Sequence, residues 1–437
     1  MGGIVVPTAK RPVKRKRTVL KGLEKGRQMH HRPNPGRWFY SFIPFKISTG
    51  GAAPLIPLLT MDVGGGPAEV GVVNAIGSTA SMLGGLFWGK LSDRLNRRKV
   101  FLVAGFLGTA LSTILFSIAK SVHQIMMINA LYTFFIAATI PVPILIITKA
   151  FRLEDWDYAI GRFNEIGGWA WVAGMGVGLL LAQFLGLRGI FIALGMIGLL
   201  SVPWGVRTIR EVPLHLRRET LGVYAGYVIE KFRYIPNVIT HLPRISTRGF
   251  GKLYGASLLF WIGAMLYFTQ FPVLLRERGF SPSVLYLMGI GNSAVSAFMY
   301  MRVGRRLGRE GGYSALIRGL LLRAGAFTLI VLAMQLNGPQ FLVLSFVSYF
   351  MAGYTWAFIG ISTTSIISRG ASARNRGALI GAYNMISSIG AIAGNFISGF
   401  ITESLGFTSD FGLASLLILL SVVPLIGGKV KSSGATL

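Results

Sequence analysis

The stretch GKLSDRLNRRK, from Gly89 to Lys99, surrounds one aspartate, Asp93, with five basic residues. Apolar stretches adjoin it on both sides, from Ala68 to Trp88 and from Val100 to Ala119. Each apolar stretch is about 20 residues long, which is enough helix to cross roughly 30 Å of hydrocarbon. Since lysine and arginine concentrate in the cytoplasmic loops of membrane proteins, we interpret Gly89–Lys99 as a cytoplasmic turn between two membrane spans.

The composition of the whole chain is that of a membrane protein. Of its 437 residues, 52% are hydrophobic and only 14% are charged, whereas soluble proteins carry roughly 25% charged residues. The 57 glycines suit close packing between transmembrane helices. We therefore predict an all-α membrane protein with twelve transmembrane helices, at residues 38–60, 67–90, 99–119, 122–149, 157–185, 187–206, 252–275, 282–303, 313–335, 339–367, 373–402 and 407–427.

The net charge of +29 is explained by where the basic residues lie. If both termini are cytoplasmic, nearly all of them fall on the cytoplasmic side, the exceptions being Lys46, Lys120, Arg188, Arg276 and Arg278. We attribute the charge to topology and to anionic lipid headgroups at the cytoplasmic face, and we expect no nucleic-acid partner. The predicted location is the plasma membrane, as a multi-pass monomer.

The chain divides into two halves joined by a polar segment. We predict a disordered basic cytoplasmic tail at residues 1–37, a six-helix half at 38–206, a basic cytoplasmic linker at 207–251, a second six-helix half at 252–428 and a short cytoplasmic tail at 429–437. Within the linker, residues 214–232 fit either an interfacial amphipathic helix or an ordinary solvated segment.

The two halves repeat one another in sequence. IGRFNEI begins at Ile160 and IGAYNMI begins at Ile380, an offset of 380 − 160 = 220, and Gly174 matches Gly394 at the same offset. VGRRLGRE, residues 303–310, also echoes the charged turn after the second span. Such repeats are common in membrane transporters, where the substrate site lies between them.

The charged turn resembles the loop 2–3 signature of the major facilitator superfamily, roughly G-x-L-[SA]-D-R-x-G-R-[KR]. The matching residues are Gly89, Leu91, Asp93, Arg94, Arg97 and Arg98, and Asn96 replaces the usual glycine. Twelve spans in a 6+6 division extend the resemblance over residues 38–427. It implies the fold of that family, with close helix approach at Gly89.

The resemblance also implies a role for the turn. In this family the aspartate is understood to latch the two halves on the cytoplasmic side while the cavity faces outward. Its expected partners here are Arg374 and Arg376, at the start of the eleventh span. The alternative is that the loop only fixes the topology.

Two positions depart from the family pattern. Asn129 stands where proton-linked members often carry an arginine in span 4. The fifth span is glycine-rich, GGWAWVAGMGVG at residues 167–178, but lacks the proline of many exporters.

Charged residues inside spans are costly and usually functional. Lys46 in span 1 and Glu165 in span 5 both lie roughly 12 Å deep, at 1.5 Å of rise per residue. We predict that they are the buried cation and the deep acid of the chain, and that an ion pair between them offsets their desolvation. The alternatives are snorkelling of Lys46 to the interface and a structural hydrogen bond for Glu165.

Polar and aromatic residues of the central and gating spans are the predicted lining of the substrate cavity. They are Ser48, Thr49, Asn74, Asn129, Tyr132, Thr133, Asn164, Tyr267, Gln270, Asn292, Tyr354, Trp356, Asn384 and Asn395. This mixture favours a moderately amphiphilic organic solute over a polyanion.

We expect no enzyme activity, metal or cofactor. The chain has no cysteine, and its five histidines lack ligand spacing. GGLFWGKL, residues 84–91, has Leu91 where a phosphate-binding loop needs a hydroxyl.

The predicted function is secondary active transport of a small organic or amphiphilic solute by alternating access. Export is favoured, as by an antiporter, with proton coupling through Glu165 as an option. The alternatives are an uptake symporter for a small organic acid that pairs with Lys46, and a non-transporting membrane sensor on the same fold.

Overall fold

The computed structural model describes residues 37–95, 98–140, 143, 146–147, 156–209, 249–310, 312–370 and 376–426. These residues form helices, and no β-strand occurs among them, which confirms the predicted all-α class. Nearly all of the predicted N-terminal tail, linker and C-terminal tail lies outside the described residues.

The first half of the chain is built from short and long helices. After the 3₁₀ turn Arg37–Ser41, they are α2 Phe42–Ala52, α3 Leu55–Asp62, α4 Pro67–Leu95, α5 Arg98–Leu115, α6 Val122–Ala138, α8 Trp156–Leu181, α9 Leu187–Leu199 and α10 Ser201–Thr208. Local chemistry explains where α4 begins: Pro67 suits a first helical position, and Glu69 Oε2 accepts a 2.8 Å hydrogen bond from the Gly66 N–H.

The second half contains α13 Gly251–Glu277, α14 Pro282–Glu310, α15 Gly312–Ala333, α16 Gly338–Gly370 and α17 Arg376–Leu420. α17 is two helices separated at Gly406, whose φ of 80° is a left-handed conformation that glycine adopts without strain. We call the residues before Gly406 the first limb of α17 and those after it the second limb.

All twelve predicted spans contain helix. By length and hydropathy alone, seven helices of the described part can cross a membrane, or eight if Arg37–Ala52 and Leu55–Asp62, bent by 45°, form one span. The count of twelve crossings remains a prediction.

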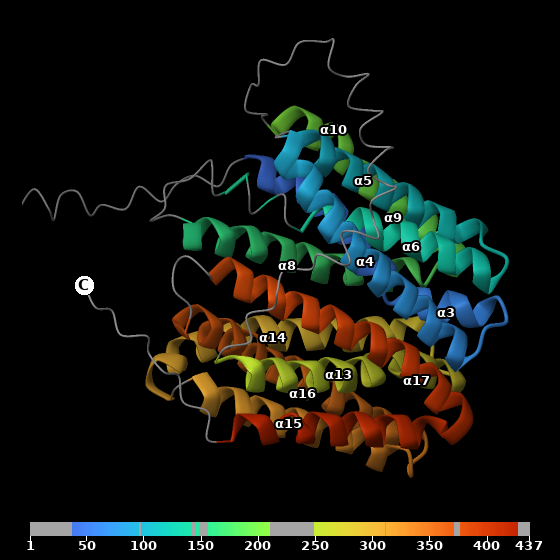
Figure 1. The fold of residues 1–437 in the computed structure, drawn as a ribbon. Helices are drawn as coiled ribbons and strands as arrows, with labels where there is room; N and C mark the ends of the chain where they lie inside the picture. Colours follow the sequence, from blue (N-terminus) through green and yellow to red (C-terminus); the bar gives the residue numbers. More distant parts are fainter. Residues whose placement is uncertain are drawn as a thin grey trace, which may run out of the picture.

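The two halves pack their helices in the same order. In the first half α2 packs on α8, α4 on α6 and α5 on α9; in the second half α13 and α15 pack on α17, and α14 on α16. Figure 1 shows the first half in the upper part of the molecule and the second half in the lower part, with α4, α8, α14 and α17 between them.

The repeated glycines explain part of this packing. A Cβ atom at Gly174 would collide with the backbone of Ile47 in α2, and one at Gly394 would lie 2.5 Å from the Ile262 carbonyl oxygen in α13. Each glycine therefore allows close approach to the first long helix of its own half, in agreement with the sequence repeat.

The helix bundle has two ends, which we call the basic face and the opposite face. At the basic face α4 ends, α5 begins at Arg98, α8 begins at Trp156, and α14 ends at Glu310. At the opposite face α3 ends at Asp62, and α4 begins at Pro67.

Candidate functional site

The two halves meet through glycines near the opposite face. A Cβ atom at Gly71 of α4 would lie 2.7 Å from the Asn395 carbonyl oxygen and 2.9 Å from the Gly399 Cα. A Cβ atom at Gly399 would in turn lie 2.7 Å from the Ala68 Cα. Because neither position has room for a side chain, α4 and the first limb of α17 touch along their backbones.

Polar side chains reinforce this contact. Asn395 Nδ2 donates to Ser78 Oγ at 2.9 Å, and Asn395 Oδ1 accepts from Thr269 Oγ1 at 2.5 Å. Gln270 Nε2 donates to the Pro67 carbonyl oxygen at 3.1 Å and to Ser398 Oγ at 3.0 Å. Hydrogen bonds from α13 and α17 thus hold the second half against α4.

A second contact joins α8 and α14 at the same face. The Tyr286 hydroxyl donates to the Gly51 carbonyl oxygen at 2.6 Å, and its ring lies against Gly178 of α8. Met175 packs on Gly289 of α14 in the same way, with its sulfur 2.8 Å from the position of a Cβ there. Both contacts between the halves therefore lie in the segments of these helices that are nearer the opposite face.

Toward the basic face the same helices are exposed. Asn164 of α8 and Asn384 of α17, which occupy equivalent positions in the repeat, are both exposed, and so is Trp169 with 61% of its surface. Among the described residues, Cβ atoms at Gly161 and Gly381 would meet nothing within 4 Å. The halves are thus packed together at one face and accessible at the other.

Glu165 is paired differently from the prediction. Its Oε2 accepts a 2.9 Å salt bridge from Arg162 Nη1, and the two side chains are 52% and 39% exposed. Within the described residues no salt bridge joins Glu165 to Lys46, so the predicted ion pair is wrong for this conformation. The physical reason is local, since Arg162 lies three residues before Glu165 on the same helix face.

Lys46 lies close to Glu165 in the fold without binding it. Its Nζ lies 5.7 Å from the centre of the Phe45 ring, and its Cε would be 3.7 Å from a Cβ at Gly167. Lys46 therefore packs its stem between α2 and α8 beside Gly167, two residues after Glu165.

Several predicted cavity residues pack inside one half. Asn129 Nδ2 donates to the Val73 carbonyl oxygen, Asn292 Nδ2 to that of Tyr349, and the Tyr267 hydroxyl bonds Ser348. The remaining members of this group, mostly bonded to their own helix or buried in ring contacts, are Ser48, Thr49, Tyr132, Thr133 and Tyr354. Asn74, Gln270 and Asn395 lie at the contact between the halves. These positions hold helices together in this conformation; substrate contact stays a prediction for them.

Aromatic side chains of three helices gather in the second half. The Trp356 ring lies 5.8 Å from that of Trp261 and 6.4 Å from that of Phe260. The Tyr300 side chain of α14 lies against Trp356. Trp261 Nε1 is buried without a hydrogen-bond partner. This aromatic cluster, with one free donor, offers flat apolar surface to a planar solute.

Two buried charges were missed by the sequence analysis. Arg323 of α15 is fully buried; its Nε donates to Thr355 Oγ1 at 2.6 Å, its Nη2 donates to the Ala352 carbonyl oxygen, and Nη1 has no partner. Asp410 of α17 is also fully buried, and neither carboxylate oxygen has a partner. The prediction that Lys46 is the buried cation and Glu165 the deep acid of the chain is therefore incomplete. The sequence could have identified both residues, because each is a charged residue within a predicted span.

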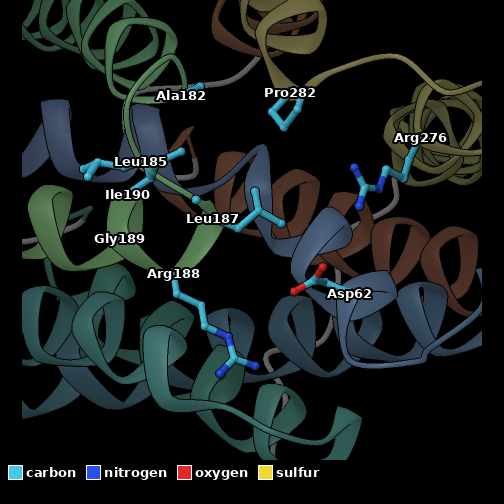
Figure 2. A pocket seen from close by; sticks show the side chains of 10 residues that line it. Asp62, Ala182, Leu185, Leu187, Arg188, Gly189, Ile190, Arg276 and Pro282 are labelled. Atoms are coloured by element: carbon cyan, nitrogen blue, oxygen red, sulfur yellow. The ribbon is translucent and has the colours of Figure 1, made fainter.

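A pocket of about 470 Å³ opens between the halves at the opposite face. Figure 2 shows Asp62 of α3 and Arg276 of α13 pointing toward each other across it, whereas Arg188 points away. Arg188 Nη2 donates to the Ala119 carbonyl oxygen at 3.2 Å, which explains its direction. This pocket is separate from the exposed asparagines at the basic face.

The charged turn is described only in part. The side chains of Asp93, Arg94, Arg97, Arg374 and Arg376 lie outside the described residues, so the latch stays untested. Gly89 is described, and a Cβ there would meet nothing within 4 Å. Since that absence holds only among the described residues, the close approach at Gly89 stays a prediction. No group of three metal-ligating side chains occurs in the described part of the chain.

Comparisons with known proteins agree with this architecture. The model of the Major Facilitator Superfamily matches residues 39–395. The inner membrane transport protein YnfM of Escherichia coli (strain K12) is 24% identical over 256 residues, which are 58% of this chain and 59% of YnfM, so less than two thirds of that relative is spanned.

Solved structures share the fold. A POT family transporter in complex with a thioalcohol-conjugated peptide superposes with a TM-score of 0.71 at 12% identity, covering 91% of this chain and 96% of that one. A bacterial homologue of the human lysosomal transporter Spinster, inward-facing and occupied, gives a TM-score of 0.65 at 16% identity, covering 90% and 94%.

Proposed function

Because the chain belongs to the Major Facilitator Superfamily and is a multi-pass membrane protein, we propose that it is a secondary active transporter that works by alternating access. Its two halves rock about a site between them, exposing that site to one side of the membrane at a time. The substrate is a small amphiphilic organic solute.

One observation carries the proposal. The helix pairs α4–α17 and α8–α14 touch near the opposite face, through Gly71 and Gly399 and through Gly178 and Tyr286. Toward the basic face, the repeat-related Asn164 and Asn384 are exposed. A protein packed between its halves at one end only has the asymmetry that one state of an alternating-access cycle requires.

The orientation follows from charge. Basic residues collect at the face where α4 ends and α5 begins, and such residues favour the cytoplasm. The basic face is therefore assigned to the cytoplasm of the plasma membrane, with both termini on that side. In this orientation the structure corresponds to an inward-open state.

The chemistry of the exposed asparagines and of the partly buried Trp356 cluster supports the substrate class. Asn164 and Asn384 supply amide donors and acceptors, and the Trp356 cluster supplies aromatic faces. Solved structures of the same fold include a nucleoside transporter and a peptide transporter. Nucleosides and short peptides combine flat or apolar groups with hydrogen-bonding groups, so they are the first solutes to test.

For direction and coupling we propose export in exchange for protons. The glycine-rich segment 167–178 favours it, and the acid Glu165 is exposed toward the face that we assign to the cytoplasm. Uptake of a small organic acid with Lys46 as its partner is the alternative that the same experiment distinguishes.

The test uses the full chain, which has no native cysteine. Spin labels at Gly161→Cys and Gly381→Cys report the basic face, and labels at the exposed Gln183→Cys and Ser281→Cys report the opposite face. In proteoliposomes, a transported nucleoside or peptide should change the two distances in opposite senses. If the labelled protein moves none of a panel of nucleosides, peptides and small organic acids, and neither distance changes, the sensor alternative replaces the proposal.

A further inference from the structure

Asp410 is an acid that the site at the basic face does not use. It lies in the second limb of α17, four residues after the break at Gly406, and is fully buried. Both of its carboxylate oxygens lack a hydrogen-bond partner in the protein. Thr402, at the end of the first limb, has a buried hydroxyl that makes no hydrogen bond of normal geometry but lies close enough to interact with the Asp410 carboxyl group.

A single carboxylate in such surroundings is far more costly than a neutral carboxylic acid. The neutral acid does not lose the contact with Thr402, because a hydroxyl that can donate to a carboxylate can also accept the proton of a carboxylic acid. The surroundings of Asp410 therefore accommodate the protonated form.

Neighbouring charges do not change this conclusion. The elements that pack against α17 carry these titratable and charged groups among the described residues: Lys252, Tyr254, Tyr267, Arg276, Glu277 and Arg278 of α13 and its end, Glu69 and Lys90 of α4, Tyr313, Arg318 and Arg323 of α15, Tyr349 and Tyr354 of α16, and Tyr383 and Glu403 of α17 itself. None of them bonds Asp410. Arg278 is occupied by the Met334 and Leu336 carbonyl oxygens, and Arg323 by Thr355 and Ala352.

The position of Asp410 connects it to the contact between the halves. Thr402 lies on the same helical limb as Ser398 and Gly399, which touch Gln270 and Ala68 at the opposite face. A hydrogen bond from Asp410 to Thr402 would join the two limbs across Gly406. It would thereby hold the first limb in the place where it packs on α4.

We propose that Asp410 is a proton-binding site whose protonation stabilises closure of the opposite face. The proposal rests on the proposed transport function and adds to it a second acid, distinct from Glu165. On opening, water reaches Asp410, the O–H bond breaks, the electron pair stays on the carboxylate and the proton passes to water at the opposite face. The reverse step reprotonates the acid and lets the face close.

The experiment follows the Gln183→Cys and Ser281→Cys spin-label pair in full-length protein in proteoliposomes, over about pH 5 to 9. One linked proton can change the ratio of closed to open states by at most about tenfold per pH unit. We expect the closed fraction to fall as pH rises through the titration of Asp410, since the protonated form favours closure. Asp410→Asn, which mimics the neutral acid, should keep the face closed over the whole range.

Two further variants make the test specific. Glu403→Gln removes an exposed acid seven residues from Asp410 and should leave the pH dependence unchanged. Thr402→Val keeps the acid but removes the hydroxyl beside it, and should shift the midpoint of the pH dependence because that hydroxyl bonds the neutral and the charged acid with unequal strength. Thr402→Val also keeps the test valid if Asp410→Asn does not fold.

The outcomes separate this inference from the transport proposal. Persistence of the wild-type pH dependence in Asp410→Asn, or an unshifted midpoint in Thr402→Val, overturns the role of Asp410 while leaving alternating access intact. A wild-type distance that does not respond to pH overturns it as well. If substrate also fails to change either label distance, the proposed function fails independently.

Discussion

Asn395 of α17 and Ser78 of α4 are hydrogen bonded across the two halves of the protein, with Nδ2 and Oγ 2.9 Å apart. The same asparagine accepts a hydrogen bond from Thr269 of α13. One amide thus ties three helices together at the end where the halves are closed. Its two functional groups are both used, so no smaller or apolar side chain reproduces the arrangement.

Loss of this amide should favour opening at the opposite face. In Asn395→Leu the hydroxyls of Ser78 and Thr269 lose their partner, and hydrogen bonds between membrane helices are worth about 0.6–2 kcal/mol each. A double-mutant cycle with Ser78→Ala, read from the Gln183–Ser281 label distance, should give a coupling of about 0.5–1.5 kcal/mol. Thr79→Ala is the control, because the Thr79 hydroxyl bonds only Ala75 of its own helix. Additive effects of the two variants would contradict the link.

Gly71→Ala should disturb the same closed state by a different route. The new methyl group would lie 2.7 Å from the Asn395 carbonyl oxygen, and the opposing backbone has no flexible side chain to move aside. Overpacking of this kind costs about 1–3 kcal/mol. We expect a larger open fraction by the same label pair. Gly85→Ala in the same helix is the matched control, because a Cβ there meets nothing within 4 Å; equal effects of the two changes would exclude the steric explanation.

Arg323→Lys should destabilise the second half despite keeping the charge. The guanidinium donates to Thr355 and Ala352 while its planar group lies 5.6 Å from the centre of the Phe327 ring, and an ammonium cannot reproduce that geometry. Loss of these charged hydrogen bonds should cost about 2–3 kcal/mol, seen as a lower Tm in detergent. The exposed Arg207→Lys should leave Tm unchanged. A Tm equal to that of the wild type would show that only the charge matters.

Sequence periodicity predicted the helices well because spans and charged turns are local signals. The sequence repeat identified Gly174 and Gly394 as equivalent positions, and both lie against the backbone of a neighbouring helix. A glycine that is required for such close approach in both halves recurs at the offset of the repeat. Depth was harder to predict. Asp410 lies near the start of a predicted span, where an acid could reach water, and only the packing of α13, α15 and α16 around α17 shows that it is enclosed.

The partner of Glu165 could not be predicted from the depth of the residues in the membrane. Lys46 and Glu165 have equal predicted depth on adjacent helices, but depth does not specify which helix faces turn toward each other. Arg162 and Glu165 are three residues apart on one helix, so their salt bridge could have been predicted from sequence without tertiary information.

Glu165→Gln should separate coupling from structure. Since the Arg162 bridge is exposed, losing it should change stability by only about 0–1 kcal/mol. If Glu165 carries the coupled proton, the variant should lose gradient-driven accumulation yet retain passive exchange of substrate in proteoliposomes. Arg162→Gln, which breaks the same bridge but keeps the acid, should retain both activities. If adding Lys46→Met restored accumulation, the result would support an ion pair between Lys46 and Glu165 in another conformation of the protein.

Asp93→Asn should raise the population of the state that is open at the basic face. A carboxylate near the membrane interface needs donors, and the predicted donors, Arg374 and Arg376, lie in the other half of the chain. Such a bond can form only when the basic face closes, so its loss destabilises the other state of the cycle and not the one described here. A charged hydrogen bond is worth about 1.5–3 kcal/mol, which is a population shift of roughly tenfold or more.

The Gly161–Gly381 label pair measures that shift directly, because both positions are open in this conformation. Asp93→Asn should lengthen the mean distance, and Arg374→Gln should do the same without adding to it, since the two changes remove one bond. Lys90→Gln alters the charge of the same turn at an exposed position and should leave the distance unchanged. If all three variants match the wild type, the turn sets topology alone and the halves are held on the basic face by other contacts.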